Sequence, residues 1–158
     1  DAFRERRCLV PATGFYEWRQ SGSRKQPMNI RLAGGEPFYF AGLWRTSLIA
    51  RKPGVGAATD EPEPADTFVI ATTAPNRLME SIHNRMPVIL DQAGCDQWLD
   101  EGAGETAARD LLRPCDADAM EAWPVDAAVG SPAHDEPGCL ERVEVRAQPV
   151  QLNLFDDL

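Results

Sequence analysis

Short apolar runs separated by glycine, proline and polar residues dominate the first half of the chain. The segment "RCLVPATGFYEWR" predicts two strands joined by a turn at a proline and a glycine. The runs "PMNIRL" and "FYFAGLW", on either side of Gly34–Gly35, have the form of a β-hairpin. Alternation along the second strand places Phe15 and Glu17 on one face and Tyr16 and Trp18 on the other.

The rest of the chain mixes strand-like runs with short helical patterns. A region rich in glycine, proline, alanine and acidic residues, Thr46–Asp66, predicts a surface loop. "TFVIATT" and "PVILD" predict strands, and Pro75 begins a short helix between them. Asp91 is the expected N-cap of a further helix, and the helix "ETAARDLL" is expected to stop at Pro114. Strands with segregated short helices predict an α+β, mostly β fold.

Composition limits the classes of protein that fit. The length of 158 residues predicts one domain, residues 1–146, followed by a flexible tail, residues 147–158. The formal charge is −9 at pH 7, so any nucleic-acid contact must use a local basic patch on an acidic body. The four cysteines form no C-x-x-C pair, so we expect no metal site and no cofactor, and free thiols suit a reducing cytoplasm. The chain opens "DAFRERRC" without an initiator methionine, and we expect it to be a fragment of a longer protein.

Two residues carry candidate chemistry. His83 lies in "SIHNRMP", between a helix-like and a strand-like run. Histidine titrates near neutral pH and suits proton transfer, although it can also simply interact with a helix end. Glu17 lies between two aromatic residues, and it either faces solvent or is enclosed in a cleft where it can exchange protons. The two would form an acid/base pair if they converge on one pocket, but strand periodicity does not show that they do.

Sequence blocks in a fixed order point to a family. The blocks "RRCLVPATGFYEW", "AGLW", "TFVIATTAPN" running into "SIHNRMPVIL", and "WPVDAAVGSP" resemble, in order and approximate spacing, the SRAP family of SOS response-associated peptidases. The resemblance covers Phe3 to Val145. It implies a bifurcated sheet forming a pseudo-barrel with short peripheral helices, here incomplete at its N-terminus. It also implies that Glu17 and His83 face one active site.

The resemblance implies a specific reaction. SRAP proteins process abasic sites in single-stranded DNA, where a cysteine exposed by removal of the initiator methionine captures the sugar aldehyde as a thiazolidine. The glutamate would position or deprotonate the cysteine amine, and the histidine would shuttle protons, also in the self-cleavage behind the peptidase name. The resemblance implies that this cysteine and an asparagine-arginine motif lie upstream of this chain. Cys8 is internal and is expected to be a buried structural thiol, so enzyme activity of the chain by itself is left open and we expect no crosslinking.

Several residues are candidates for contacting DNA. Arg85 is expected to contact a phosphate, and the Thr72 hydroxyl is expected to donate a hydrogen bond to a backbone oxygen. Trp18 and Trp44 are candidate stacking platforms, although large aromatic residues in strands more often belong to the core. An arginine cluster is either a second basic site or a solvated edge, and consists of Arg4, Arg6 and Arg7.

The C-terminal residues "QLNLF" look like the peptide with which bacterial repair factors dock on the replication sliding clamp. Its expected anchors are Gln151, Leu152, Leu154 and Phe155, and an ordinary apolar terminal strand is the alternative. We expect a bacterial cytoplasmic protein associated with the replicating nucleoid, with abasic single-stranded DNA and the clamp as partners. The alternatives for function are a non-catalytic single-strand-binding or clamp-tethered adaptor and a Glu/His hydrolase unrelated to DNA.

Overall fold

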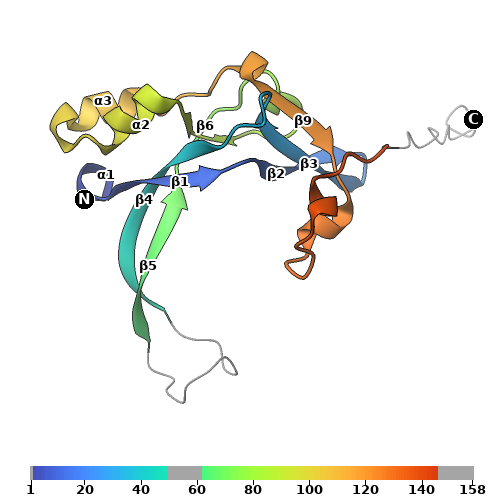
Figure 1. The fold of residues 1–158 in the computed structure, drawn as a ribbon, viewed down its shortest axis with the longest axis horizontal. Helices are drawn as coiled ribbons and strands as arrows, with labels where there is room; N and C mark the ends of the chain where they lie inside the picture. The colour runs from blue at the N-terminus through green and yellow to red at the C-terminus, as the bar shows by residue number, and fades with distance from the viewer. Residues whose placement is uncertain (1, 50–61, 146–158) are drawn as a thin grey trace, which may run out of the picture.

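The computed structural model describes residues 2–49 and 62–145, and most of its regular structure is antiparallel strand (Figure 1). The strands are β1 (Arg7–Ala12), β2 (Phe15–Ser21), β3 (Arg24–Leu32), β4 (Phe38–Ile49), β5 (Glu63–Ile70), β6 (Thr72–Thr73), β7 (Met86–Pro87), β8 (Ile89–Leu90) and β9 (Met120–Pro124). The α-helices are α1 (Ala2–Glu5), α2 (Gln92–Leu99) and α3 (Gly104–Asp110), and the 3-10 helices are η1 (Met79–Ser81), η2 (Glu101–Ala103), η3 (Ala117–Ala119), η4 (Ala127–Gly130) and η5 (Pro137–Leu140). The predicted α+β, mostly β class is confirmed.

The strands in the described residues form three antiparallel sheets that do not close into a barrel. One has the order β1-β4-β5 with β8 beside β4, the second has the order β2-β3-β9, and the third pairs β6 with β7. Helices α2 and α3 lie at one end of the molecule and the β2-β3-β9 sheet at the other, while the β4–β5 hairpin projects away from both (Figure 1). Among the described residues, no helix is long and apolar enough to cross a membrane.

The hairpin predicted around Gly34–Gly35 is wrong, because its two runs belong to different sheets. β3 pairs with β2 and β9, whereas β4 pairs with β1, β5 and β8. Each strand is buried over several consecutive residues, as in strands whose two faces are both covered, and each is paired on both edges. Those partners are distant in sequence, and a local apolar pattern does not identify them.

The predicted loop Thr46–Asp66 is wrong at both ends, and its middle, residues 50–61, lies outside the described residues. β4 continues to Ile49 and β5 begins at Glu63, so both ends of this region are paired strand. The Thr46 hydroxyl donates to Asp66 Oδ1 across the pair at 2.7 Å. The composition of this region predicted a loop, but at both of its ends backbone pairing extends the sheet.

Helices α2 and α3 cover the sheet that contains β1 and β4. The predicted N-cap is confirmed, since Asp91 Oδ1 accepts a hydrogen bond from the backbone N–H of Gly94 at 2.7 Å. Trp98 is fully buried against the sheet, and its indole N–H donates to the carbonyl oxygen of Cys8 at 3.1 Å. The helix "ETAARDLL" appears as α3 and ends at Asp110, before Pro114 as predicted.

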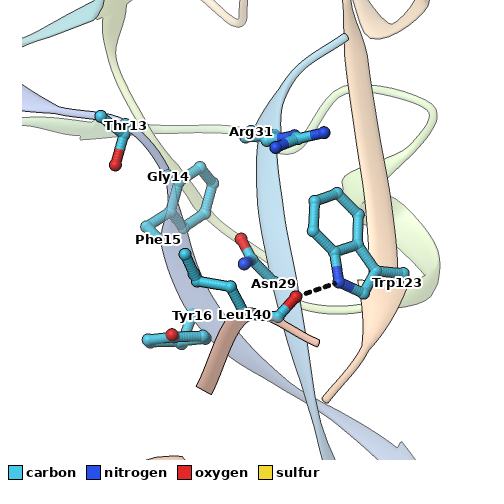
Figure 2. Close-up of a pocket in the computed structure, with 8 residues that line it drawn as sticks. All are labelled: Thr13, Gly14, Phe15, Tyr16, Asn29, Arg31, Trp123 and Leu140. Carbon is cyan, nitrogen blue, oxygen red and sulfur yellow. Dashed lines mark hydrogen bonds between the residues drawn. The ribbon is translucent and has the colours of Figure 1, made fainter. Parts of the chain in front are cut away.

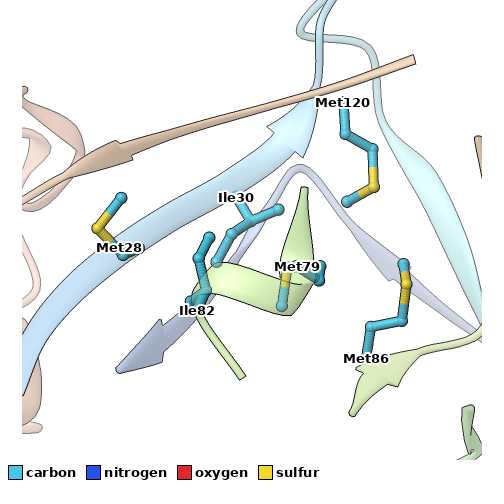
Figure 3. Close-up of a cluster of buried hydrophobic side chains, with 6 residues drawn as sticks. All are labelled: Met28, Ile30, Met79, Ile82, Met86 and Met120. Carbon is cyan, nitrogen blue, oxygen red and sulfur yellow. The ribbon is translucent and has the colours of Figure 1, made fainter. Parts of the chain in front are cut away.

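The segment between β5 and β8 is anchored at both ends on one residue of β4. Ala71 donates a backbone hydrogen bond to the Ala41 carbonyl at 2.8 Å, and Ala41 donates to the Val88 carbonyl at 3.0 Å. Between these anchors the helix predicted after Pro75 is a single 3-10 turn, η1. Its apolar side chains join a core cluster beneath β3, which Figure 3 shows and which consists of Met28, Ile30, Met79, Ile82, Met86 and Met120.

Asn76 fixes this segment against the 115–120 region. Its side-chain Nδ2 donates to the Cys115 carbonyl at 3.0 Å and lies 3.2 Å from the Met120 sulfur, while its Oδ1 accepts from the Met79 backbone N–H at 3.0 Å. One amide therefore satisfies groups on two segments that are distant in sequence.

Replacing Asn76 with alanine should lower the free energy of unfolding by about 1–3 kcal/mol, because the substitution leaves half-buried backbone groups without partners. Urea unfolding followed by tryptophan fluorescence measures the change. The exposed Asn84→Ala is the matched control and should stay within about 0.5 kcal/mol of the parent. Equal stability of the two variants would show that Asn76 does not hold the segment.

Candidate functional site

Glu17 and His83 lie next to each other, although 66 positions separate them in sequence (83 − 17). The Glu17 Oε2 atom is 3.9 Å from His83 Nδ1. Strand β2 pairs Glu17 with Met28, which faces the core cluster, and His83 follows Ile82 of the same cluster. The core packing that buries Met28 and Ile82 therefore brings the carboxylate and the imidazole together.

The imidazole of His83 has a backbone partner in either protonation state. Its Nδ1 lies 3.2 Å from the backbone nitrogen of Arg85 and 3.1 Å from the Arg85 carbonyl oxygen. An unprotonated Nδ1 accepts from the N–H, whereas a protonated Nδ1 donates to the carbonyl and faces the Glu17 carboxylate. A proton can therefore be gained or lost at this atom without a large rearrangement. The ring bonds to Arg85 and not to η1 carbonyls, so the helix-end interpretation of His83 does not describe these contacts.

The pair is accessible to a ligand. The His83 side chain is 43% exposed and the Glu17 side chain is 27% exposed. The backbone N–H of His83 donates to the Met79 carbonyl at 2.9 Å, so the imidazole projects from an anchored turn. Glu17 Oε1 accepts from the Trp18 backbone N–H at 3.1 Å, which fixes one carboxylate oxygen and leaves Oε2 toward His83.

Arg85 and Thr72, both predicted to contact DNA, are bonded to each other beside this pair. Arg85 Nε donates to Thr72 Oγ1 at 2.9 Å, and Arg85 Nη2 donates to the Thr72 carbonyl at 2.7 Å. Both residues are exposed, and the guanidinium carries further N–H groups for an anion. The Thr72 oxygen acts as an acceptor in this contact, so its own O–H can still donate.

The two tryptophans are not core residues, contrary to the expectation for aromatic residues in strands. Trp18 and Trp44 are each 37% exposed. Trp18 directly follows Glu17 on the opposite face of β2, whereas Trp44 lies in the other large sheet with the Arg6 guanidinium 5.5 Å from its ring centre. Neither tryptophan therefore shares a face with the Glu17–His83 pair.

The three arginines near the N-terminus each contact different partners. The Arg7 guanidinium donates to the backbone carbonyls of Trp98 and Asp100, so it serves the packing of α2. Arg4 lies 3.6 Å from a Glu105 oxygen, and Arg6 lies over Trp44. These contacts do not combine into one basic surface around the Glu17–His83 pair.

The cysteines of the described residues form no disulfide, and these residues contain no cluster of metal-ligating side chains. Cys8 is half-buried rather than buried, and burial raises its pKa. Burial also raises the pKa of the Cys95 thiol, and burial with a smaller effect of Asp116 raises that of Cys115 to about 11. A neutral thiol is a poor nucleophile, so these three cysteines are unsuited to attack at neutral pH.

Sequence reasoning did not single out Asn76, which holds the turn that carries His83. The available signal was an asparagine directly before a short helical run, where such residues bond to the first turn. Its bonds to the 115–120 region depend on tertiary packing and had no signal in the sequence.

Comparisons with known proteins agree with this architecture. The family described as SOS response associated peptidase (SRAP) matches residues 1–132. The abasic site processing protein YoqW of Bacillus subtilis is 40% identical over 138 residues, covering 86% of this chain and 57% of that protein. The abasic site processing protein HMCES of Gallus gallus is 34% identical over 151 residues, covering 89% of this chain and 44% of that protein.

Solved structures show the same fold. A crystal structure of a Bacteroides thetaiotaomicron protein matches with a TM-score of 0.75 and 30% identity, covering 90% of this chain and 59% of that one. A Bordetella bronchiseptica protein matches with a TM-score of 0.64 and 27% identity, covering 79% and 56%. The chain thus spans about half the length of the relatives that it matches. Because the family match covers most of the chain, this protein belongs to the SRAP family.

Proposed function

We propose that this chain carries the acid/base half of an abasic-site processing centre that acts on single-stranded DNA. The observation that supports it most is the 3.9 Å approach of Glu17 to His83 in a chain of the SRAP family. The relatives named above are abasic site processing proteins, which also argues against a hydrolase unrelated to DNA.

The proposed chemistry begins with the neutral amine of an N-terminal cysteine supplied by the full-length protein. The amine attacks the sugar aldehyde, and the resulting carbinolamine loses water to give an imine. The thiol sulfur then adds to the imine carbon, and the thiol proton passes to the nitrogen, which closes a thiazolidine. Glu17 accepts the proton that the amine must lose, and His83 donates a proton to the departing hydroxyl. The same pair would serve the self-cleavage that gives the family its peptidase name.

Arg85 and Thr72 are proposed to hold the DNA backbone beside this pair. The overall charge of −9 repels a polyanion, so binding must depend on local cations. Arg85 offers N–H groups to a phosphate oxygen, and Thr72 both orients the guanidinium and offers its hydroxyl. Trp18 is half-exposed on the face of β2 opposite to Glu17, where it would stack on a base that passes around the sheet edge.

In a full-length protein that contains this chain, His83→Ala and Glu17→Gln should each slow adduct formation by a factor of about 10²–10⁴, because each removes a positioned proton-transfer group. Single-stranded DNA with one abasic site, followed on denaturing gels from pH 5 to 8, measures the rate. The 158-residue chain, without the N-terminal cysteine, is the control that should retain no DNA. Folded variants that react at the parent rate across this pH range would refute the assignment.

Arg85→Gln should weaken binding of single-stranded DNA and reduce the slope of log Kd against log salt concentration by about 0.7, the value for one phosphate contact. Fluorescence anisotropy of a labelled strand at several salt concentrations gives the slope. Arg77→Gln is the matched control, since Arg77 is exposed and pairs with Asp118 outside this site. A slope that changes equally in both variants would show that Arg85 is not a specific phosphate contact.

We also propose that residues 147–158 form a tail that docks on the replication sliding clamp, beyond a domain of residues 1–146. These residues lie outside the described part of the chain, so the proposal rests on the pattern "QLNLF". Two leucines and a phenylalanine would enter an apolar pocket, and the glutamine amide would fix their orientation. A protein that keeps the tail but lacks the nucleophile would act as the adaptor considered above.

A synthetic peptide covering Ala147–Leu158 should bind a bacterial sliding clamp reversibly, because ordering a free segment costs roughly 2–5 kcal/mol and weakens the affinity. The control peptide carries alanine at Gln151, Leu154 and Phe155 and should not bind. Isothermal titration into the low-millimolar range distinguishes the two. Equal affinity for both peptides, or no binding by either, would leave the tail without this role.

A further inference from the structure

A cavity lies on the face of the β2-β3-β9 sheet opposite to Glu17. Three residues directly paired across the strands, Tyr16, Asn29 and Trp123, point to this face, whereas Glu17 and Met28 point to the other. The cavity has a volume of about 260 Å³, slightly below the range of about 300–1,000 Å³ that is usual for small-molecule sites. It therefore suits a ligand with one compact ring system.

The walls of this cavity combine aromatic and polar side chains, and three of the polar groups are already bonded. The Tyr16 hydroxyl donates to the Cys139 carbonyl at 3.1 Å, and the Trp123 indole N–H donates to the Leu140 carbonyl at 3.0 Å. Arg31 Nε donates a hydrogen bond to Glu121 Oε1 at 2.8 Å. The Arg31 guanidinium lies over the Trp123 ring, 4.7 Å from the ring centre. These contacts fix the side chains around the cavity.

Asn29 differs from these three residues. It is only 2% exposed, yet its side-chain amide has no hydrogen-bond partner in the part of the chain that the structure describes. Figure 2 shows this amide among the side chains that line the cavity. Because Asn29 lines the cavity, its amide nitrogen and oxygen are placed to meet a ligand there. A buried polar group of this kind is unfavourable unless a ligand or water bonds it.

We propose that this cavity binds a nucleobase, with adenine preferred. An asparagine amide presents a donor and an acceptor side by side, and this pair matches the amino group and adjacent ring nitrogen of adenine. The aromatic rings of Tyr16 and Trp123 supply apolar surface of the kind on which bases stack. The base comes either from a free nucleoside or from an intact nucleotide of a bound single strand. Neither source requires abasic-site chemistry, so the inference does not depend on the function proposed above.

Two nucleosides test this proposal on the unmodified chain. Adenosine should bind with a dissociation constant on the order of 1 mM, because a ligand of this size makes few contacts. Purine riboside lacks the amino group and should bind about tenfold more weakly, because Asn29 Oδ1 loses its donor. Isothermal titration gives both affinities, and the shift of the Trp123 indole N–H signal in NMR spectra locates the binding. Equal affinities, or no shift of that signal up to saturation, would exclude a free nucleoside as the source of the base.

Asn29→Leu removes the amide with little change of side-chain volume and should abolish the difference between the two nucleosides. Gln20→Leu removes an exposed amide from the neighbouring strand and should leave the difference unchanged. An oligo(dA) strand without abasic sites separates the two sources of the base. If only the strand shows a loss of affinity on Asn29→Leu, the base belongs to bound DNA. If Asn29→Leu changes neither the affinity for the nucleosides nor the affinity for the strand, the proposal is wrong.

Discussion

The packing of the segment between β5 and β8 against β3 is the contact on which the candidate site depends. Met79, Ile82 and Met86 are almost completely buried beneath Met28 and Ile30. Burying side chains of this size stabilises the contact by about 1.5–3 kcal/mol each relative to exposure, so apolar burial is the main force that holds the segment in place. The hydrogen bonds of Asn76 then select one orientation of the turn. Neither residue of the proposed acid/base pair contributes to this packing, which leaves their side chains free to meet a substrate.

Alternation along β2 and β3 gives the same sheet two functional faces. Glu17 and Met28 share the core-facing side, while Tyr16 and Asn29 share the side covered by the segment around Leu140. A shift of the strand pairing by one residue would exchange these faces, so both sites depend on the same register. If both proposals hold, a bound strand has an acid/base pair on one side of the sheet and a base pocket on the other. The distance around the sheet edge then determines which nucleotide can enter the pocket.

Local chemistry was predictable from the sequence, whereas pairing and burial were not. The N-cap at Asp91 and the strand around Glu17 depend on neighbouring residues, and both were predicted. The partners of β3 and β4 are distant in sequence, so their runs were misread as one hairpin. The exposure of Trp18 was also missed, because strand propensity does not say which face another segment covers. Asn29 and Asn76 resemble ordinary amides in the sequence, and only their surroundings distinguish the open amide from the fully bonded one.

The central claim is that Glu17 and His83 work as one proton-transfer unit. A double-mutant cycle tests it most directly, with the rates of adduct formation on abasic single-stranded DNA measured for the full-length protein, Glu17→Gln, His83→Ala and the double variant. If the residues act together, the double variant should be no more than a few-fold slower than the slower single variant. The first substitution already removes most of the rate enhancement that the pair provides, so the second has little further effect. If the rate of the double variant falls by the product of the two single-variant factors, the residues act independently, which contradicts the claim.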